Sequence, residues 1–265
     1  MPRLPMLKIR SRRIAFRMLT IPTCLLIWEL LARSGLYNEK LFPGPSQVFV
    51  TLWADLRSGL VLADARVSLS RVAVGYLSGA LIGIAFGVLT GRSDLARATV
   101  GQVFQLIRPI PPISFVPVAV LWFGLGEFAK YFLVFFGVFF PIWMNAHLGI
   151  SNIERSYIWT AQSMGASSWN QIFDVYLPAA APLIFAGLRV AVAISFYCLV
   201  AAEIAGAFSG LAFRIQVSHL AFRVDRMFAG LIVLGILSSA ADQGLAFGIR
   251  KLFPWTKEGA RQNGR

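Results

Sequence analysis

Two histidines, His147 and His219, are the only imidazole groups in the 265-residue chain. The sequence has neither the H-E-x-x-H spacing of a zinc protease nor the G-x-S-x-G turn of a serine hydrolase. It also lacks a G-x-x-x-x-G-K-[ST] loop, whose backbone amides could hold the phosphates of ATP. These absences indicate a protein that is not an enzyme, with no catalytic residue and no metal site of its own.

A few ionisable or polar side chains lie within long apolar runs, where a charge is costly and each is a candidate functional residue. Arg108 could attract an anionic solute, although snorkelling of its side chain to the inner bilayer surface is the favoured interpretation. For Glu203, an ion pair with an outer-loop arginine is favoured over a role in a gate. Asn145 either lines a solute path or packs, and Glu29 and Asp242 are expected to pair with arginines or to snorkel.

The overall composition excludes most soluble proteins. Hydrophobic residues make up 57% of the chain and charged residues only 14%, too few to cover the surface of a soluble domain. So apolar a chain cannot remain an open coil in water either. The 25 basic residues outnumber the 12 acidic ones, but they flank apolar runs. This placement indicates membrane orientation and argues against a nucleic-acid partner.

Six runs are long enough to cross a bilayer, which requires roughly 20 mainly apolar residues for each helix. The sequence therefore predicts an all-α, polytopic membrane bundle. The third run contains Pro109, Pro111, Pro112 and Pro117, so it must be broken or kinked. The six predicted segments lie at about residues 14–32, 72–90, 100–125, 131–149, 183–204 and 227–249.

The basic residues also predict the orientation of the chain. With both termini in the cytoplasm, fifteen of the 25 fall on inner segments and nine on outer loops, with Arg108 inside a run. Ser11-Arg12-Arg13 imitates a twin-arginine signal, but the run that follows contains Glu29 and no clear cleavage site comes after it. We therefore expect an uncleaved first helix.

Two further patterns precede the third run. Residues 47–65 form an amphipathic pattern that we place on the outer membrane surface as one segment. In the second run a glycine recurs at every fourth position, which predicts a stripe where another helix approaches closely. The stripe consists of Gly75, Gly79, Gly83, Gly87 and Gly91.

The largest inner loop, residues 151–182, shifts to polar and small residues. Its pattern predicts a short helix that ends near Gly165, then a second short helix that is ended by Leu177 and Pro178. Apolar residues on both helices face water, which indicates docking into a groove of a partner protein.

The spacing of this loop resembles the cytoplasmic EAA loop of bacterial ABC-importer permeases. Trp159 stands where the family pattern has an acidic residue, and Ser168 where a basic one is common. The resemblance implies an ATPase-coupling role for six loop residues: Ala161, Gly165, Ala166, Leu177, Pro178 and Pro182.

The resemblance extends over about residues 66–255. The stretch Arg108-Pro109-Ile110-Pro111-Pro112, the stretch Leu121-Trp122-Phe123-Gly124-Leu125-Gly126 and the stretch Val200-Ala201-Ala202-Glu203 are similar to the nitrate/sulfonate/taurine branch of these permeases. This implies a type I permease-like fold in the bacterial inner membrane that imports a small, anionic solute.

The same resemblance implies partners and a division of the chain. The partners are cytoplasmic ATPase subunits that bind ATP and Mg²⁺, a periplasmic substrate-binding protein and a second permease copy, and this chain itself binds no cofactor. Residues 1–65 form an N-terminal region, 66–255 the permease domain and 256–265 a basic tail. Two alternatives stay open, a coupling subunit of a vitamin-uptake complex and an ion-driven secondary transporter.

Overall fold

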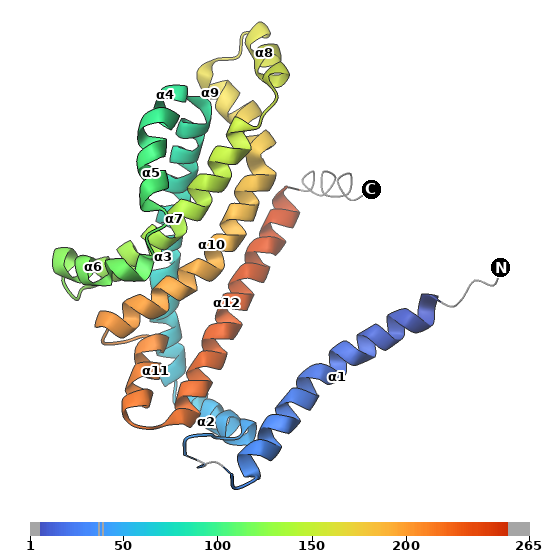
Figure 1. Ribbon diagram of the computed structural model, residues 1–265, viewed down its shortest axis with the longest axis vertical. Helices are drawn as coiled ribbons and strands as arrows, with labels where there is room; N and C mark the ends of the chain where they lie inside the picture. Colours follow the sequence, from blue (N-terminus) through green and yellow to red (C-terminus); the bar gives the residue numbers. More distant parts are fainter. Residues whose placement is uncertain (1–5, 37, 39, 254–265) are drawn as a thin grey trace. The chain divides into compact units, whose positions relative to one another are not determined.

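A computed structural model describes residues 6–36, 38 and 40–253, apart from the side chains of residues 6–18 and 252. The basic tail predicted at 256–265 lies outside the described residues. Those that are described form helices joined by turns, with no strand among them (Figure 1). The α-helices are α1 (Met6–Arg33), α2 (Pro45–Arg57), α3 (Leu60–Arg92), α4 (Asp94–Ala96), α5 (Gln102–Ile107), α6 (Val116–Phe123), α7 (Glu127–Ser151), α8 (Arg155–Ser163), α9 (Ser168–Asn170), α10 (Leu177–Gly206), α11 (Leu211–Leu220) and α12 (Val224–Leu252).

The chain divides into two compact units. Of the described residues, those up to 62 and those at 214–232 form one unit, and those at 63–213 and 233–253 form the other. Within the first unit, α2 is tied to the beginning of α12, because Arg226 pairs with the buried carboxylate of Asp55 at 3.2 Å. The Thr51 hydroxyl donates a hydrogen bond to Asp225 at 2.9 Å across the same two helices.

Four described helices are long and apolar enough to cross a membrane: Leu60–Arg92, Glu127–Ser151, Ser168–Gly206 and Val224–Lys251. The pair Asp94–Ile107 and Pro112–Phe123 is bent by 88° and passes the same test when its two parts are taken together, which gives a fifth span if the pair crosses as one. This bend confirms the break predicted from the prolines of the third run. The first predicted segment, 14–32, lies within the helix α1, which is not among these spans; the side chains of residues 6–18, 13 of its 28 residues, lie outside the described part of the chain.

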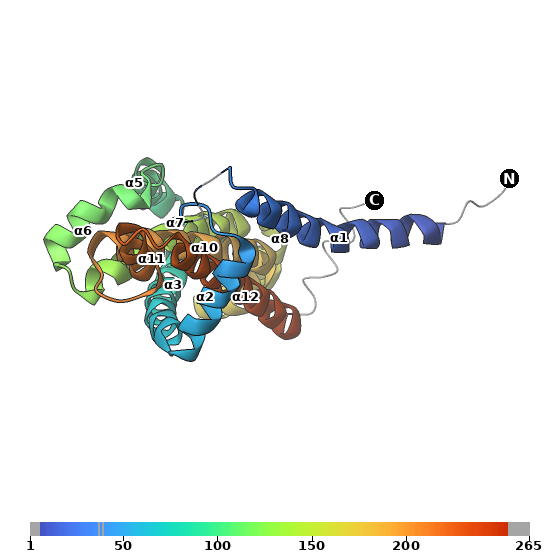
Figure 2. The same cartoon turned by 90° about the horizontal axis from the view of Figure 1, so that it is seen from below.

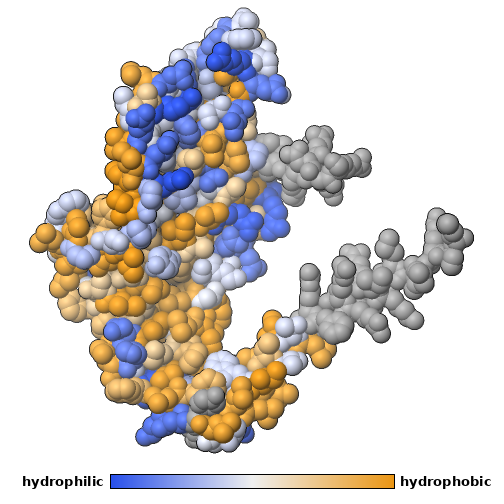
Figure 3. Space-filling view, viewed as in Figure 1, coloured by the Kyte–Doolittle hydropathy of each residue, from blue (hydrophilic) through white to orange (hydrophobic). Residues whose placement is uncertain are grey.

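The surface of the second unit is apolar where the bent pair is expected to face the membrane. Leu95, Val103, Leu106 and Leu121 expose large apolar side chains along the bent pair. Figure 3 shows apolar atoms over this region and hydrophilic atoms gathered at the end that carries α8. Figure 2 shows α6 turned to the side of the α7 and α10 pair.

The predicted glycine stripe faces α7. Each of its five glycines lies against an α7 backbone carbonyl 56 positions later in the chain, from Tyr131 for Gly75 to His147 for Gly91. The offset stays constant because α3 and α7 run parallel. A methyl group at Gly83 would lie 3.0 Å from the Phe139 carbonyl oxygen. The close approach predicted from the stripe is confirmed.

Small residues also let α7 and α10 meet closely. A methyl group at Gly149 would lie 2.9 Å from the Ala180 side chain, and one at Gly187 would lie 2.7 Å from Asn145 Cβ. A methyl group at Gly137 would overlap the Cys198 sulfur. Helices α3, α7 and α10 therefore pack with backbones in near contact, and a glycine lies at each crossing.

Two predicted boundaries were wrong. The amphipathic pattern at 47–65 is not one segment, because α2 ends at Arg57 and Gly59 adopts a φ of +75°, which turns the chain before α3 begins at Leu60.

The second correction concerns Leu177 and Pro178, which do not end a helix. Residues 168–206 form one continuous helix with a π-helical stretch at Gln171–Tyr176. Pro178 cannot donate to Asp174, four residues before it, and that carbonyl lies within the π-helical stretch. The wider turn lets the helix pass the proline.

Candidate functional site

A hollow of about 460 Å³ lies at the helix break, between the end of α5, the middle of α7 and α10. Arg108 and Asn145, two of the three residues predicted for a solute path, both line it. The other lining residues are mainly apolar: Ile110, Pro112, Phe136, Gly137, Phe140, Pro141, Met144, Ile194 and Tyr197. The structure thus joins a cation, an amide and several rings around one space.

Arg108 owes its place to the broken span. It follows the last residue of α5, and its backbone N–H donates to the Phe104 carbonyl at 2.9 Å. The prolines that follow cannot continue the helix, so Arg108 stands at the end of α5, where its side chain lines the hollow. No ion-pair partner of Arg108 occurs among the described residues.

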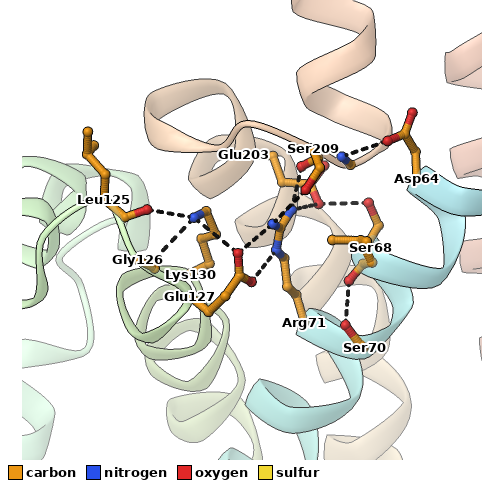
Figure 4. Close-up of polar contacts among 12 residues, drawn as sticks. Asp64, Ser68, Ser70, Arg71, Leu125, Gly126, Glu127, Lys130, Glu203 and Ser209 are labelled. Carbon is orange, nitrogen blue, oxygen red and sulfur yellow. Dashed lines mark hydrogen bonds and ion pairs between the residues drawn. The ribbon is translucent and has the colours of Figure 1, made fainter.

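The third predicted residue, Glu203, lies elsewhere. Its side chain is fully buried, and it pairs with Arg71 at 2.8 Å (Figure 4). Arg71 in turn donates two hydrogen bonds of 2.7 Å to Glu127, whose neighbour Lys130 donates to the Leu125 and Gly126 carbonyls. Two cations and two anions therefore form a cluster that joins α3, α7 and α10. Arg71, Lys130 and Glu203 are buried in it, while the Glu127 side chain is 47% exposed.

The cluster also organises the beginning of α11. The backbone N–H of Ala212 donates to Glu203 at 2.8 Å, and that of Leu211 donates to the Ser68 hydroxyl at 2.9 Å. Asp64 accepts from Gly210 in the same way at 3.0 Å. Side chains of α3 and α10 thus satisfy amides that the helix itself leaves unpaired, and their carboxylates lie at its positive end.

The expected ion pair of Glu203 is present, but its partner Arg71 belongs to α3 and not to an outer loop, and Lys130 belongs to α7. The signal that could have placed Arg71 was its spacing. It stands four residues before Gly75, and therefore on the same stripe toward α7 as the glycines. Asp242 pairs with Arg189 at 2.8 Å and Glu29 with Arg33 at 2.6 Å.

The predicted coupling loop forms a helical hairpin. Helix α8 ends at Ser163, and Gly165 has a φ of +77°. The Gly165 N–H donates to Gln162 and the Ala166 N–H to Ala161, each at 3.0 Å, which is the hydrogen-bond pair of a glycine helix stop. Three predicted coupling residues, Ala161, Gly165 and Ala166, therefore build this turn. Leu177 packs at the loop base, while Pro178 and Pro182 are exposed on α10.

The two faces of the hairpin differ. Ile158, Ile172 and Tyr176 pack against the inner cluster around Ala146 and Ile150, so this half of the predicted apolar stripe is not exposed to water. The opposite face exposes large apolar side chains: Tyr157, Trp159, Met164, Trp169 and Phe173. The Trp169 and Phe173 rings stack at 6.1 Å.

A cation reaches the loop from another helix. Arg92, the last residue of α3, donates to the Ser168 hydroxyl at 3.2 Å and lies 5.6 Å from the centre of the Tyr176 ring. Ser168 occupies the position where the EAA loop of bacterial ABC-importer permeases commonly has a basic residue. The sequence spacing could not reveal that α3 supplies the charge there.

Comparisons with known proteins agree with this architecture. The chain is 31% identical over 262 residues to the taurine transport system permease protein TauC of Escherichia coli, covering 94% of this chain and 92% of TauC. It is 28% identical to the nitrate import permease protein NrtB of Synechocystis, covering 92% and 90% of the two chains. A chain of the inward-facing MetNI methionine ABC transporter superposes with a TM-score of 0.64 at 20% identity, covering 74% of this chain and 98% of that one. Residues 79–247 match the profile of one family, and the chain belongs to it: the binding-protein-dependent transport system inner membrane components.

Proposed function

We propose that this permease is the membrane subunit of an ATP-driven importer, and that it moves a small anionic solute delivered by a periplasmic binding protein. The class of solute is supported by the names of its relatives, which handle taurine and nitrate. ATP and Mg²⁺ would be bound by a separate ATPase subunit. Two copies of the chain, each with both termini in the cytoplasm, would enclose the path.

One observation carries this proposal. The continuous helix Ser168–Gly206 has 39 residues and is therefore about 58 Å long. It begins in the exposed hairpin, contributes Ile194 and Tyr197 to the hollow and contains Glu203 near its far end. Its glycine contacts with α7 leave little room for the two helices to slide. A displacement of the hairpin by an ATPase would thus reach the hollow through one rigid element.

The test is transport by the complete system in sealed vesicles. With the ATPase and binding protein present, we expect uptake of radiolabelled taurine that requires ATP and persists when ion gradients are collapsed. Uptake driven by an ion gradient without ATP would indicate a secondary transporter instead. Uptake that requires a membrane-embedded substrate binder and no soluble one would indicate a vitamin-type coupling subunit.

The hairpin turn gives a prediction about coupling. Replacing Gly165 by valine is expected to reduce ATP-driven uptake at least about tenfold, because a β-branched residue strains the left-handed backbone that the turn requires. A Cβ atom at Gly165 meets nothing within 4 Å, so backbone strain is the cause, not a clash. Gly165→Asn is the matched control, since asparagine tolerates this conformation. Equal losses of uptake in the two variants would show that backbone strain is not responsible.

A second prediction concerns the chemistry of docking. Trp159 has 62% of its surface exposed and stands where related loops have an acidic residue. Trp159→Ala is expected to weaken assembly with the ATPase about tenfold, because exposed tryptophans often anchor interfaces. The control is Trp53→Ala, which removes an exposed tryptophan from α2. Assembly, measured by surface plasmon resonance, should depend little on salt; a steep salt dependence would indicate ionic docking instead.

A further inference from the structure

The hollow between α5, α7 and α10 holds one cation without a described counter-charge. Arg108 is the only charged residue among those that line it. Arg108 lies at the break of the bent membrane span, its side chain is exposed, and no described residue forms an ion pair with it, so its charge is open to an anionic ligand. We infer that the hollow is a binding site for a small organic anion inside the membrane domain, with Arg108 holding the anionic group. This inference rests on the proposed function and gives its solute a place and a chemical class.

Two polar groups that line the same hollow as Arg108 suit an anionic head group. Asn145 Nδ2 donates one N–H to the Pro141 carbonyl at 2.8 Å, which leaves its second N–H for a ligand. The Tyr197 hydroxyl belongs to a side chain that is 59% exposed at the same hollow. A sulfonate or carboxylate could accept from the guanidinium and from these two groups together.

The rest of the lining decides between an organic and an inorganic anion. Phe136, Phe140, Met144 and Ile194 offer no hydrogen-bond donor to an anion. A nitrate ion would lose water on that side and gain no hydrogen bond in return. An alkyl group attached to the anion would instead bury its apolar surface there. The hollow therefore favours an aliphatic sulfonate or carboxylate over an inorganic anion.

The site is also held in shape. Gly187 packs against the Asn145 side chain and Gly137 against Cys198, so the α7 and α10 walls cannot close on each other. The Phe115 and Phe136 rings lie 4.3 Å apart, which fixes the chain just after the break against α7. A hollow of about 460 Å³ with rigid walls has the size of a preformed small-molecule site.

Binding to the intact permease tests this inference without transport. The full chain is placed in nanodiscs of neutral phosphatidylcholine, and ethanesulfonate is titrated while saturation transfer to its methyl protons is recorded by NMR. We expect saturable binding that Arg108→Gln weakens at least about tenfold, as expected when a charged hydrogen-bond partner is lost. Arg108→Lys, which keeps the positive charge, should weaken ethanesulfonate binding less than Arg108→Gln does.

Matched controls define the chemistry. Arg66→Gln removes an exposed arginine from α3 and should leave binding unchanged. Ethyl methyl sulfone, a neutral analogue of similar shape, and nitrate should each compete at least about tenfold more weakly than unlabelled ethanesulfonate. Equal binding by wild type and Arg108→Gln would overturn the inference, and so would equal competition by nitrate.

Two further measurements distinguish a lipid ligand from a solute, and the site from the transport function. If phosphatidylglycerol in the nanodisc abolishes ethanesulfonate binding, the hollow takes a lipid phosphate and the inference is overturned. ATP-driven uptake by the complete system that is the same in Arg108→Gln and wild type would keep the proposed function and reject this site. Ethanesulfonate binding through Arg108 without any ATP-driven uptake would keep the site and reject the proposed function.

Discussion

Replacing Arg71 by methionine is expected to destabilise the permease by about 3–5 kcal/mol, the cost of removing one partner from a buried ion pair. Arg71 has 1% of its side chain exposed, and Glu203 has 0%. Without the guanidinium, the donors that remain to the Glu203 carboxylate among the described residues are the Ser68 hydroxyl and the Ala212 amide. A buried anion would then remain without a cation. In a fixed detergent we expect the unfolding midpoint to fall by roughly 10 °C.

The cluster supplies its own controls. Arg66→Met removes an exposed arginine from the same helix and should change the midpoint little. The double variant Arg71→Met, Glu203→Gln leaves Glu127 paired with Lys130, so the cluster is neutral again. We expect it to recover part of the loss, as a double-mutant cycle would measure. If the two single changes simply add, the ion pair does not account for the stability of this region.

Replacing Gly87 by leucine is expected to cost about 3 kcal/mol, the upper end of what overpacking a well-packed interface costs. A side chain there would overlap Ala146 Cβ and would lie about 3 Å from two backbone atoms of α7, at Trp143 and His147. Backbone atoms cannot rotate away, so α3 and α7 would separate. The hydrogen bond of 3.0 Å from Trp143 Nε1 to the Thr90 hydroxyl, buried between the same helices, would break as well.

Gly235→Leu is the matched control for this change. Gly235 lies within the membrane helix α12, and a Cβ atom there meets nothing within 4 Å. Leucine at this position should be neutral or slightly stabilising, because glycine is a poor helix former. The unfolding midpoint and the yield of folded protein in the membrane fraction measure both variants. Similar losses in Gly87→Leu and Gly235→Leu would show that helix insertion, not the α3–α7 contact, is affected.

The Arg71 and Gly87 predictions test two different contacts within the same three-helix bundle. The glycine contacts set how close α3, α7 and α10 lie, and the ion cluster fixes their register at one end. The hairpin that extends from α10 lies at the other end of the same three helices. We therefore expect coupling variants in the hairpin to retain stability, and packing variants in the stripe to lose stability and transport together.

Periodicity alone was sufficient for much of the architecture. The long apolar runs, the prolines of the third run and the spacing of the glycine stripe are local signals. Each depends on the residues of one segment or of one helix face. For that reason the broken span and the close α3 contact were predictable. The boundaries at Gly59 and Pro178 were harder to place. The helix boundary at Gly59 depends on a single backbone φ of +75°, and the absence of one at Pro178 depends on a π-helical stretch. Several residue types are compatible with a helix that ends at such a position and with one that continues.

For the candidate site, too, some properties follow from the sequence and others only from the tertiary structure. The sequence by itself determined that Arg108, Asn145 and Glu203 are polar groups at membrane depth, because hydropathy is a property of each segment. Only the tertiary structure decided that Arg108 and Asn145 share a hollow, that Glu203 is bound to Arg71, and that Arg92 reaches Ser168. Those pairings join residues 37 to 132 positions apart, and they depend on how α3, α5, α7 and α10 pack, which no pattern within a single helix specifies.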